Sequence, residues 1–224
     1  MTRWARGFLF LTAAWATVAT VVSLSSMARA HPHAWVDVSV KLTVDDSGRV
    51  TSTRQIWLFD DFYSAFAVDG LDGDGDGQPD MDKLDELTLN NLEALQEYQY
   101  FTDVRIGGER IAFDEATEMS SAMRGKRYEM SFTIPFRAQT VRWGGGLTYA
   151  IYDPTYYVEM MHAESDAAIG FAGSTDGCTY VLEEPNPEPA VVAFAAALDK
   201  TQSAGDGLGV LFAQKVTVTC SRKP

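Results

Sequence analysis

The sequence is poor in cysteine, histidine and basic side chains. Two cysteines and three histidines occur in 224 residues, and 18 Lys and Arg stand against 31 Asp and Glu, so the formal net charge is −13. A chain this acidic repels phosphate backbones, which excludes nucleic acid as a partner and favours cations. The sequence also lacks a nucleophile elbow, a phosphate-binding loop, a zinc-protease helix and a Cys-x-x-Cys motif. We therefore expect a protein that is not an enzyme.

The two cysteines, Cys178 and Cys220, both lie late in the chain. In an exported protein, two cysteines with no others in the chain are typical of one structural disulfide. Such a disulfide would stabilise the fold by about 4 kcal/mol on the chain-entropy model. A two-cysteine metal site is the alternative, but neither cysteine has a histidine or a second cysteine near it in the sequence. We therefore interpret the pair as a disulfide.

The first thirty residues are typical of a secretory signal peptide. Arg3 and Arg6 give a positive start, residues 7–24 are apolar, and "ARA" at 28–30 has the small–x–small pattern of a cleavage site. This pattern predicts Sec-type export, a periplasmic location and one mature domain, residues 31–224, that is not inserted in the membrane. Cleavage would remove three arginines and no acid, which changes the net charge from −13 to −16. An uncleaved anchor is the alternative, because the apolar run is long enough to span a bilayer.

Alternating apolar residues predict that most of the mature chain forms β-strands. The stretch "HAWVDVSVKLTV" places Ala34 and every second residue up to Val44 on one face, and "RVTSTRQIWLF" after the turn at 45–48 completes a hairpin. Further strands are expected within 102–113, 127–136, 146–161, 178–183 and 210–220. We expect an α+β, mainly β fold: a β-sandwich-like core with an EF-hand-like helix–loop–helix insertion and a short C-terminal helix that begins at Pro189.

The helical insertion is expected at residues 59–100. "FDDFYSAF" predicts a short helix capped by Asp60, and an acidic loop follows it. A longer helix is expected after the loop, because apolar residues recur there at helical spacing: Leu84, Leu87, Leu92, Leu95 and Tyr98. The insertion therefore has the order helix, loop, helix that an EF-hand requires.

The loop "DGDGDGQPDMDK" has the spacing of an EF-hand calcium loop, with Gly77 at the turning sixth position. The expected Ca²⁺ ligands are Asp72, Asp74, Asp76, the carbonyl of Gln78, and Asp80. Position 12 departs from the pattern, because Lys83 stands where a bidentate glutamate normally closes the site. Asp82 or Asp85 would have to replace it, or the site is weaker and more open. We expect a structural calcium site; a solvated acidic loop is the alternative.

The mature chain would begin "HPHAW", with His31 as a free residue. The α-amine and ring of His31 and the ring of His33 then offer three nitrogens, which suit Ni, Co, Zn or Cu. Pro32 has no N–H to lose, so copper or nickel binding through deprotonated backbone amides is blocked and a brace of amine and two rings is favoured. We expect His31 and His33 to bind a transition metal ion.

The third histidine, His162, follows an aromatic strand and is a further candidate ligand. A carboxylate would complete such a site, and the sequence does not choose among Asp37, Asp153, Glu159 and Glu164. The alternative is an ordinary core or surface histidine.

Together, "HPHAW", "WLFDDFYSAF", the acidic loop, "LQEYQYF" and "YDPTYY" resemble an uncharacterised bacterial family. Its members are described as periplasmic components of transport systems and often accompany nickel/cobalt permeases. The resemblance covers nearly the whole mature chain, and it implies a periplasmic, metal-associated protein in which His31 and His33 carry the metal. Lys83 departs from the acidic residue that the family pattern has in the loop.

These observations favour a periplasmic accessory protein that captures a transition metal (nickel, cobalt, zinc or copper) for a membrane permease, its partner, and that carries a structural calcium loop. Two alternatives stay open. One is a copper oxidoreductase, because a histidine brace on a β-sandwich can support oxygen chemistry. The other is a calcium-stabilised, non-enzymatic interaction module in which the histidines are incidental.

Overall fold

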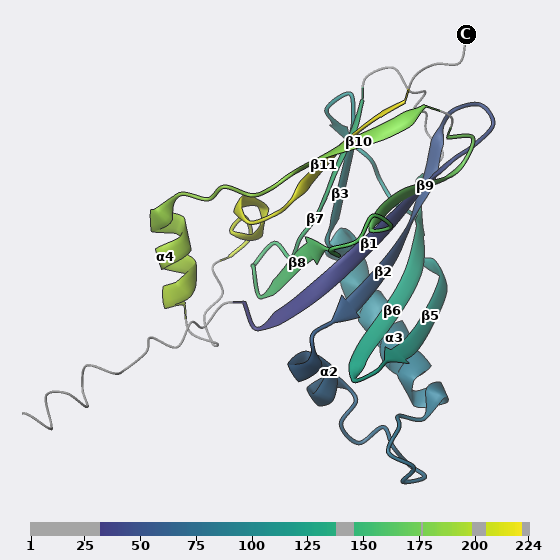
Figure 1. Cartoon of the computed structure of the whole chain (residues 1–224), viewed down its shortest axis with the longest axis vertical. Helices are drawn as coiled ribbons and strands as arrows, with labels where there is room; N and C mark the ends of the chain where they lie inside the picture. Colours follow the sequence, from purple (N-terminus) through teal and green to yellow (C-terminus); the bar gives the residue numbers. More distant parts are fainter. Residues whose placement is uncertain (1–31, 138–145, 176, 199–204, 221–224) are drawn as a thin grey trace, which may run out of the picture.

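The computed structural model describes residues 32–137, 146–175, 177–198 and 205–220. In these ranges the chain forms two β-sheets and three α-helices (Figure 1). The mainly β, α+β fold expected from the sequence is confirmed. Among the helices of the described ranges, none has the length and apolar character that a membrane span requires.

The first sheet has the order β5-β6-β2-β1-β8, and β9 also pairs with β1. Its strands are β1 (Ala34–Val44), β2 (Val50–Phe59), β5 (Thr117–Arg124), β6 (Arg127–Pro135), β8 (Val158–His162) and β9 (Ile169–Gly173). β1 and β2 form the expected antiparallel hairpin, whereas β8 and β9 run parallel to β1 and pair with its first and second halves in turn. The N-terminal strand is therefore held on one side by segments that come more than a hundred residues later.

The second sheet has the order β10-β11-β7-β3-β4. Its strands are β3 (Thr102–Ile106), β4 (Glu109–Arg110), β7 (Leu147–Ile151), β10 (Cys178–Glu183) and β11 (Lys215–Cys220). Cys178 and Cys220 stand opposite each other in the β10–β11 pair and form a disulfide, which confirms their interpretation as a structural pair. The alternative of a two-cysteine metal site is thereby excluded.

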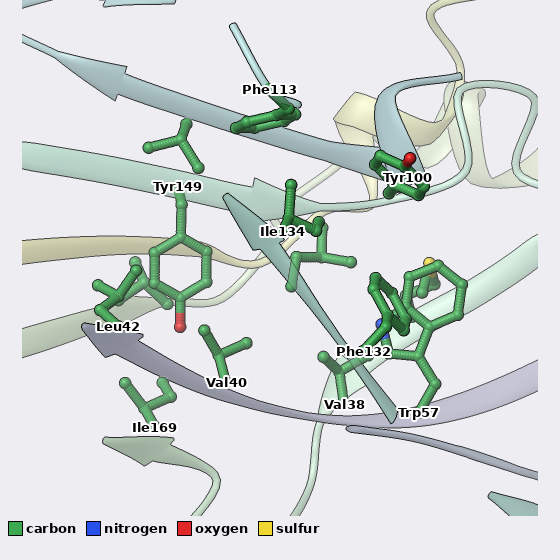
Figure 2. Close-up of a cluster of buried hydrophobic side chains, with 14 of the residues drawn as sticks. Val38, Val40, Leu42, Trp57, Tyr100, Phe113, Phe132, Ile134, Tyr149 and Ile169 are labelled. Carbon is green, nitrogen blue, oxygen red and sulfur yellow. The ribbon is translucent and has the colours of Figure 1, made fainter. Parts of the chain in front are cut away.

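The core lies between the two sheets. All six apolar residues of the β1 alternation are buried, and the β6 side chains Tyr128, Met130, Phe132 and Ile134 have no exposed surface. In Figure 2, Val38, Val40 and Leu42 of β1 lie on the side of their sheet that faces Tyr149 of β7. Each fully buried aliphatic or aromatic side chain of this kind contributes about 1.5–3 kcal/mol of transfer free energy.

A buried polar network crosses the core between the sheets. Gln55 on β2 donates from Nε2 to Thr102 Oγ1 at the start of β3, and its Oε1 accepts from Trp57 Nε1 at 2.8 Å. Thr102 Oγ1 in turn donates to the carbonyl of Tyr100. Gln55 has no exposed surface, so every one of these hydrogen bonds is made away from water.

The helices α2 (Asp61–Ala67) and α3 (Met81–Gln96) lie between β2 and β3 in the chain, as the sequence predicts. Leu84, Thr88 and Leu92 form the buried face of α3. The Thr88 hydroxyl shares a 2.6 Å hydrogen bond with the Tyr128 hydroxyl. α3 ends at Gln96, before Tyr98, and the expectation that Tyr98 continues its apolar face is wrong. The chain turns instead through the 3₁₀ segment η1 (Gln99–Phe101), where Tyr100 has a positive φ.

α4 (Pro189–Ala197) begins at the expected proline, and a second 3₁₀ segment, η2 (Gly209–Leu211), precedes β11. Tyr156 stacks on Phe212 with ring centroids 3.9 Å apart, and these rings form a small apolar cluster with Ala195, Leu198 and Leu208. The helix is therefore attached to the sandwich through the segment that leads into β8.

Candidate metal centre

His33 lies immediately before β1, at the corner where that strand meets β8. Its backbone N–H donates to the carbonyl of Tyr157 at 2.8 Å, and its imidazole packs on the Tyr157 ring with centroids 4.5 Å apart. The parallel pairing of Ala34 with Val158 continues this contact into the sheet. The ring of His33 is thus positioned by both main chain and side chain. His31 lies outside the described residues.

Asp60 joins α2 to the same corner. Its Oδ2 accepts from Trp35 N at 2.9 Å, and its Oδ1 accepts from Phe62 N and Tyr63 N as the N-cap of α2. The Asp60 N–H donates back to the Trp35 carbonyl. Both carboxylate oxygens therefore serve the backbone, and the expected cap is confirmed.

Tyr63 brings a second tyrosine close to this corner. Its ring stacks on Phe59 at 4.8 Å, and burial, reinforced by the nearby Tyr157 and Asp60, raises the pKa of its hydroxyl. A neutral phenol is therefore the form present at neutral pH. We call His33, Asp60, Tyr63 and Tyr157 the histidine corner.

His162, at the end of β8, lies between the two sheets. Its Nδ1 is 2.9 Å from Gln214 Oε1, and its Nε2 is 3.1 Å from the Tyr149 hydroxyl on β7. Gln214 Nε2 donates to both carboxylate oxygens of Glu184, which assigns Oε1 as the acceptor for the imidazole N–H. His162 is therefore the tautomer protonated on Nδ1, with Nε2 accepting from Tyr149. Burial lowers the pKa of His162.

The structure does not bring His162 and His33 together. His33 lies beside Tyr157, whereas His162 pairs with Val38, five residues further along both strands. At about 3.3 Å per residue this places the two histidines about 16 Å apart along the sheet. Any metal at His162 would have to displace the Tyr149 or the Gln214 hydrogen bond.

The carboxylates considered as partners of His162 have other contacts. Asp37 pairs with Arg127 at 2.8 Å, and Glu159 accepts from the Tyr156 hydroxyl. The Asp153 carboxylate accepts from the backbone N–H groups of Thr155 and Val158. Glu164 lines a cavity of about 670 Å³ next to His162, together with Asp37, Glu184 and Gln214.

The acidic loop between α2 and α3 has the folded shape of a cation loop. Asp72 accepts from Gly75 N and Gly77 N, and Gly77 has the positive φ that the sixth position of such a loop requires. One oxygen each of Asp72, Asp74 and Asp80 lie within 4.8 Å of one another. Of the five expected ligands, the structure therefore brings these three carboxylates together.

The other two expected ligands, Asp76 and Gln78, contact each other. Asp76 Oδ1 accepts from Gln78 N at 2.8 Å, and Asp76 stands outside the three-carboxylate group. No cluster of three or more His, Cys, Asp or Glu ligand atoms occurs elsewhere in the described ranges.

At position 12 of the loop, the ammonium group of Lys83 lies where an EF-hand has a carboxylate. Its Nζ lies 2.8 Å from Asp80 Oδ2 and 3.5 Å from the Leu71 carbonyl. The hydrogen bond to Asp80, with the nearby charges of Asp82 and Asp72, raises the pKa of Lys83, and the same contact lowers the pKa of Asp80. A Cβ at residue 73 would lie 2.5 Å from this ammonium, so Gly73 allows the close approach.

Sequence reasoning missed two contacts of the candidate ligands. Tyr157 lies in the aromatic stretch for which the sequence predicts strands, and nothing in that stretch marks a contact with a histidine 124 positions earlier. Gln214 directly precedes Lys215 in the sequence, and nothing in this stretch marks Gln214 as a buried residue that contacts His162.

A model of the family described as "Protein of unknown function (DUF1007)" matches residues 16–220. The chain belongs to this DUF1007 family. The match takes in the histidine corner, the acidic loop and both cysteines, so these features lie within the part of the chain that the family shares. The expectation of a family of unknown function is confirmed.

Two relatives of this DUF1007 protein are described as uncharacterised. An "Uncharacterized protein" of Haemophilus influenzae is 26% identical over 193 residues, which cover 85% of this chain and 91% of that protein. An "Uncharacterized 15.5 kDa protein in trpE 3'region" of Spirochaeta aurantia is 27% identical over 94 residues, or 42% of this chain and 66% of that protein. No solved structure matches significantly.

Proposed function

We propose that this DUF1007 protein is an exported accessory protein that binds a transition metal ion at His31 and His33 and delivers it to a membrane permease. The observation that carries the proposal is the fixed position of His33. Tyr157 holds its main chain and its ring at the head of β1, two residues after the first residue of the predicted mature chain.

The chemistry of the donors supports nickel, cobalt, zinc or copper. Imidazole and amine nitrogens are ligands of borderline metals, and Pro32 between the histidines cannot supply a deprotonated amide. We leave His162 out of this site because of its distance from His33. The leader pattern and the Cys178–Cys220 disulfide support the periplasm as the location, because disulfides persist in oxidising compartments.

The proposal includes Ca²⁺ at the acidic loop as a structural ion. Asp72, Asp74 and Asp80 supply converging oxygens, as a hard cation requires. For the ion to use Asp80 fully, the Lys83 ammonium has to move away from it. We therefore expect a weak site that stabilises the insertion when calcium is abundant.

Native intact mass of the exported protein, followed by metal titration of variants, tests the transition-metal site. A chain that begins at His31 and carries one transition metal ion is expected. His31→Ala and His33→Ala should each abolish sub-micromolar binding of Ni²⁺, Co²⁺, Zn²⁺ and Cu²⁺, whereas His162→Gln should retain it. Unchanged affinity in both N-terminal variants, or a retained leader, would contradict the proposal.

The same protein distinguishes the two other functions. An oxidoreductase predicts an axial Cu²⁺ spectrum and peroxide-dependent turnover that His33→Ala abolishes. An interaction module predicts that Ca²⁺ raises the melting temperature while no transition metal binds. Either result would replace the accessory function proposed here.

A further inference from the structure

Two phenylalanines of α2 point away from the protein. Phe62 is 80% exposed and Phe66 is 78% exposed, and their spacing of four residues puts them on one face of the helix. The other face is anchored, because Tyr63 stacks on Phe59 and the Ser64 hydroxyl accepts from Tyr128 N. The helix is therefore fixed in place while it presents two large apolar side chains to solvent, an arrangement typical of a contact surface.

This pair lies beside the histidine corner. α2 begins at Asp60, whose carboxylate also holds Trp35 N, and Figure 1 shows α2 next to the start of β1. Trp35 on β1 and Tyr157, immediately before β8, add partly exposed rings. A molecule that contacts Phe62 and Phe66 therefore comes within reach of the place where we expect the metal.

The segment that carries the two phenylalanines is strongly acidic, and its charge favours a basic partner. Residues 60–97 contain twelve Asp and Glu and one basic residue, Lys83, so this segment supplies −11 of the formal −13 charge. The one lysine is already paired with Asp80. An anionic membrane surface would be repelled, and so would the same segment of a second copy. A protein segment with basic and large apolar side chains meets both the charge and the phenylalanines.

We propose that Phe62 and Phe66 dock a basic amphipathic segment of a partner protein, with Asp61, Asp69 and the other acidic residues of 60–97 as its electrostatic complement. The proposal rests on the proposed function in one respect: the partner protein that contains this segment is the permease. Aromatic anchors of this kind carry much of an interface's binding energy, and the surrounding charges set its association rate and salt dependence.

The test uses the exported protein and a labelled helical peptide of leucine and lysine with one apolar face, with a leucine–glutamate peptide of the same pattern as the reference. Fluorescence anisotropy at physiological ionic strength is expected to show binding of the basic peptide alone. The Phe62→Ser/Phe66→Ser variant should bind it about tenfold more weakly. Phe194→Ser, on the half-exposed Phe194 of α4, is the matched control and should bind it like the wild type.

A second pair of variants tests the charge. Asp61→Asn/Asp69→Asn should weaken peptide binding and reduce its salt dependence, whereas Asp166→Asn, on the exposed loop after β8, should not. Metal titration of the double phenylalanine variant should match the wild type. Peptide docking does not require a bound metal ion. A failure of docking can therefore be told apart from a failure of metal binding.

Three kinds of result, on the peptide, on dimer formation and on vesicles, would overturn the proposal. The first is unchanged peptide affinity in the double phenylalanine variant, or equal binding of the acidic peptide. The second is a dimer in sedimentation that the double variant dissociates, which would assign the surface to a second copy. The third is binding to phosphatidylcholine–phosphatidylglycerol vesicles that the same variant abolishes, which would assign it to a lipid surface.

Discussion

Lys83 Nζ lies 2.8 Å from Asp80 Oδ2, so the last residue of the acidic loop is bound to one of the carboxylates that would hold a calcium ion. The Lys83 ammonium is therefore a cation already bound at the loop, and it is covalently part of the chain. A calcium ion has to compete with it for the Asp80 carboxylate.

Replacement of this lysine should strengthen calcium binding. Lys83→Glu removes the competing charge and adds a carboxylate at position 12, so calorimetric titration should show Ca²⁺ binding at least about tenfold tighter than in the wild type. Lys83→Met should give a smaller gain, because it only removes the charge. Lys126→Glu, in the exposed turn between β5 and β6, controls for net charge and should change nothing. Equal affinity in all four proteins would show that Lys83 does not compete with calcium for the loop.

The stability of the protein should fall in mild acid because of His162. Burial lowers its pKa in the folded state below the ordinary value of 6.5, so the unfolded chain binds the proton more readily. The free energy of unfolding should therefore decrease as the pH drops below 6.5 and level off only below the lowered value. Urea unfolding of wild type and His162→Gln between pH 8 and 5 checks this. Parallel curves for the two proteins would contradict the prediction.

Loss of the buried amide at Gln55 should destabilise the sandwich. Gln55→Leu keeps the volume but leaves Trp57 Nε1 without its acceptor and Thr102 without its donor, at a cost of about 2–4 kcal/mol. Gln96→Leu, at an exposed position at the end of α3, should change the free energy of unfolding by less than about 0.5 kcal/mol. Similar denaturation midpoints for the two variants would show that the network contributes little.

Removal of the disulfide should lower stability without affecting the metal. Cys178 and Cys220 are 42 residues apart in the chain, and a crosslink over such a loop stabilises by about 4 kcal/mol on the chain-entropy model. Urea unfolding of Cys178→Ser/Cys220→Ser measures this loss. Metal affinity should be retained, because the disulfide belongs to the second sheet and the histidine corner to the first. A change of less than about 1 kcal/mol would contradict the prediction.

The sequence predicts the strands whose apolar alternation is strong and misses those where it is weak. The six alternating residues of β1 and the buried run of β6 are visible as patterns of period two. β5, with the sequence TEMSSAMR, is an edge strand with no fully buried side chain, and β9 is a short strand with two glycines, so neither carries the pattern. Both are strands because of what they pair with.

Contacts between residues far apart in the chain could not be predicted from the sequence. β7 and β8 are close in the chain and look like consecutive strands of one sheet, but Asp153 and Pro154 lie in the turn where the chain passes from the second sheet to the first. That switch puts His162 between the sheets and Tyr157 beside His33. The spacing of the acidic loop was readable, whereas the position of the Lys83 ammonium depends on three-dimensional contacts.

The parallel pairing of β8 with β1 also makes the histidine corner dependent on two distant parts of the chain. Tyr157, which holds the main chain and the ring of His33, lies 124 residues after it in the sequence. Between β1 and β8 the chain contributes β3, β4 and β7 to the second sheet before it returns to the first at β8. The histidine corner therefore depends on a contact between residues far apart in the chain, and a chain truncated before residue 157 would lack it.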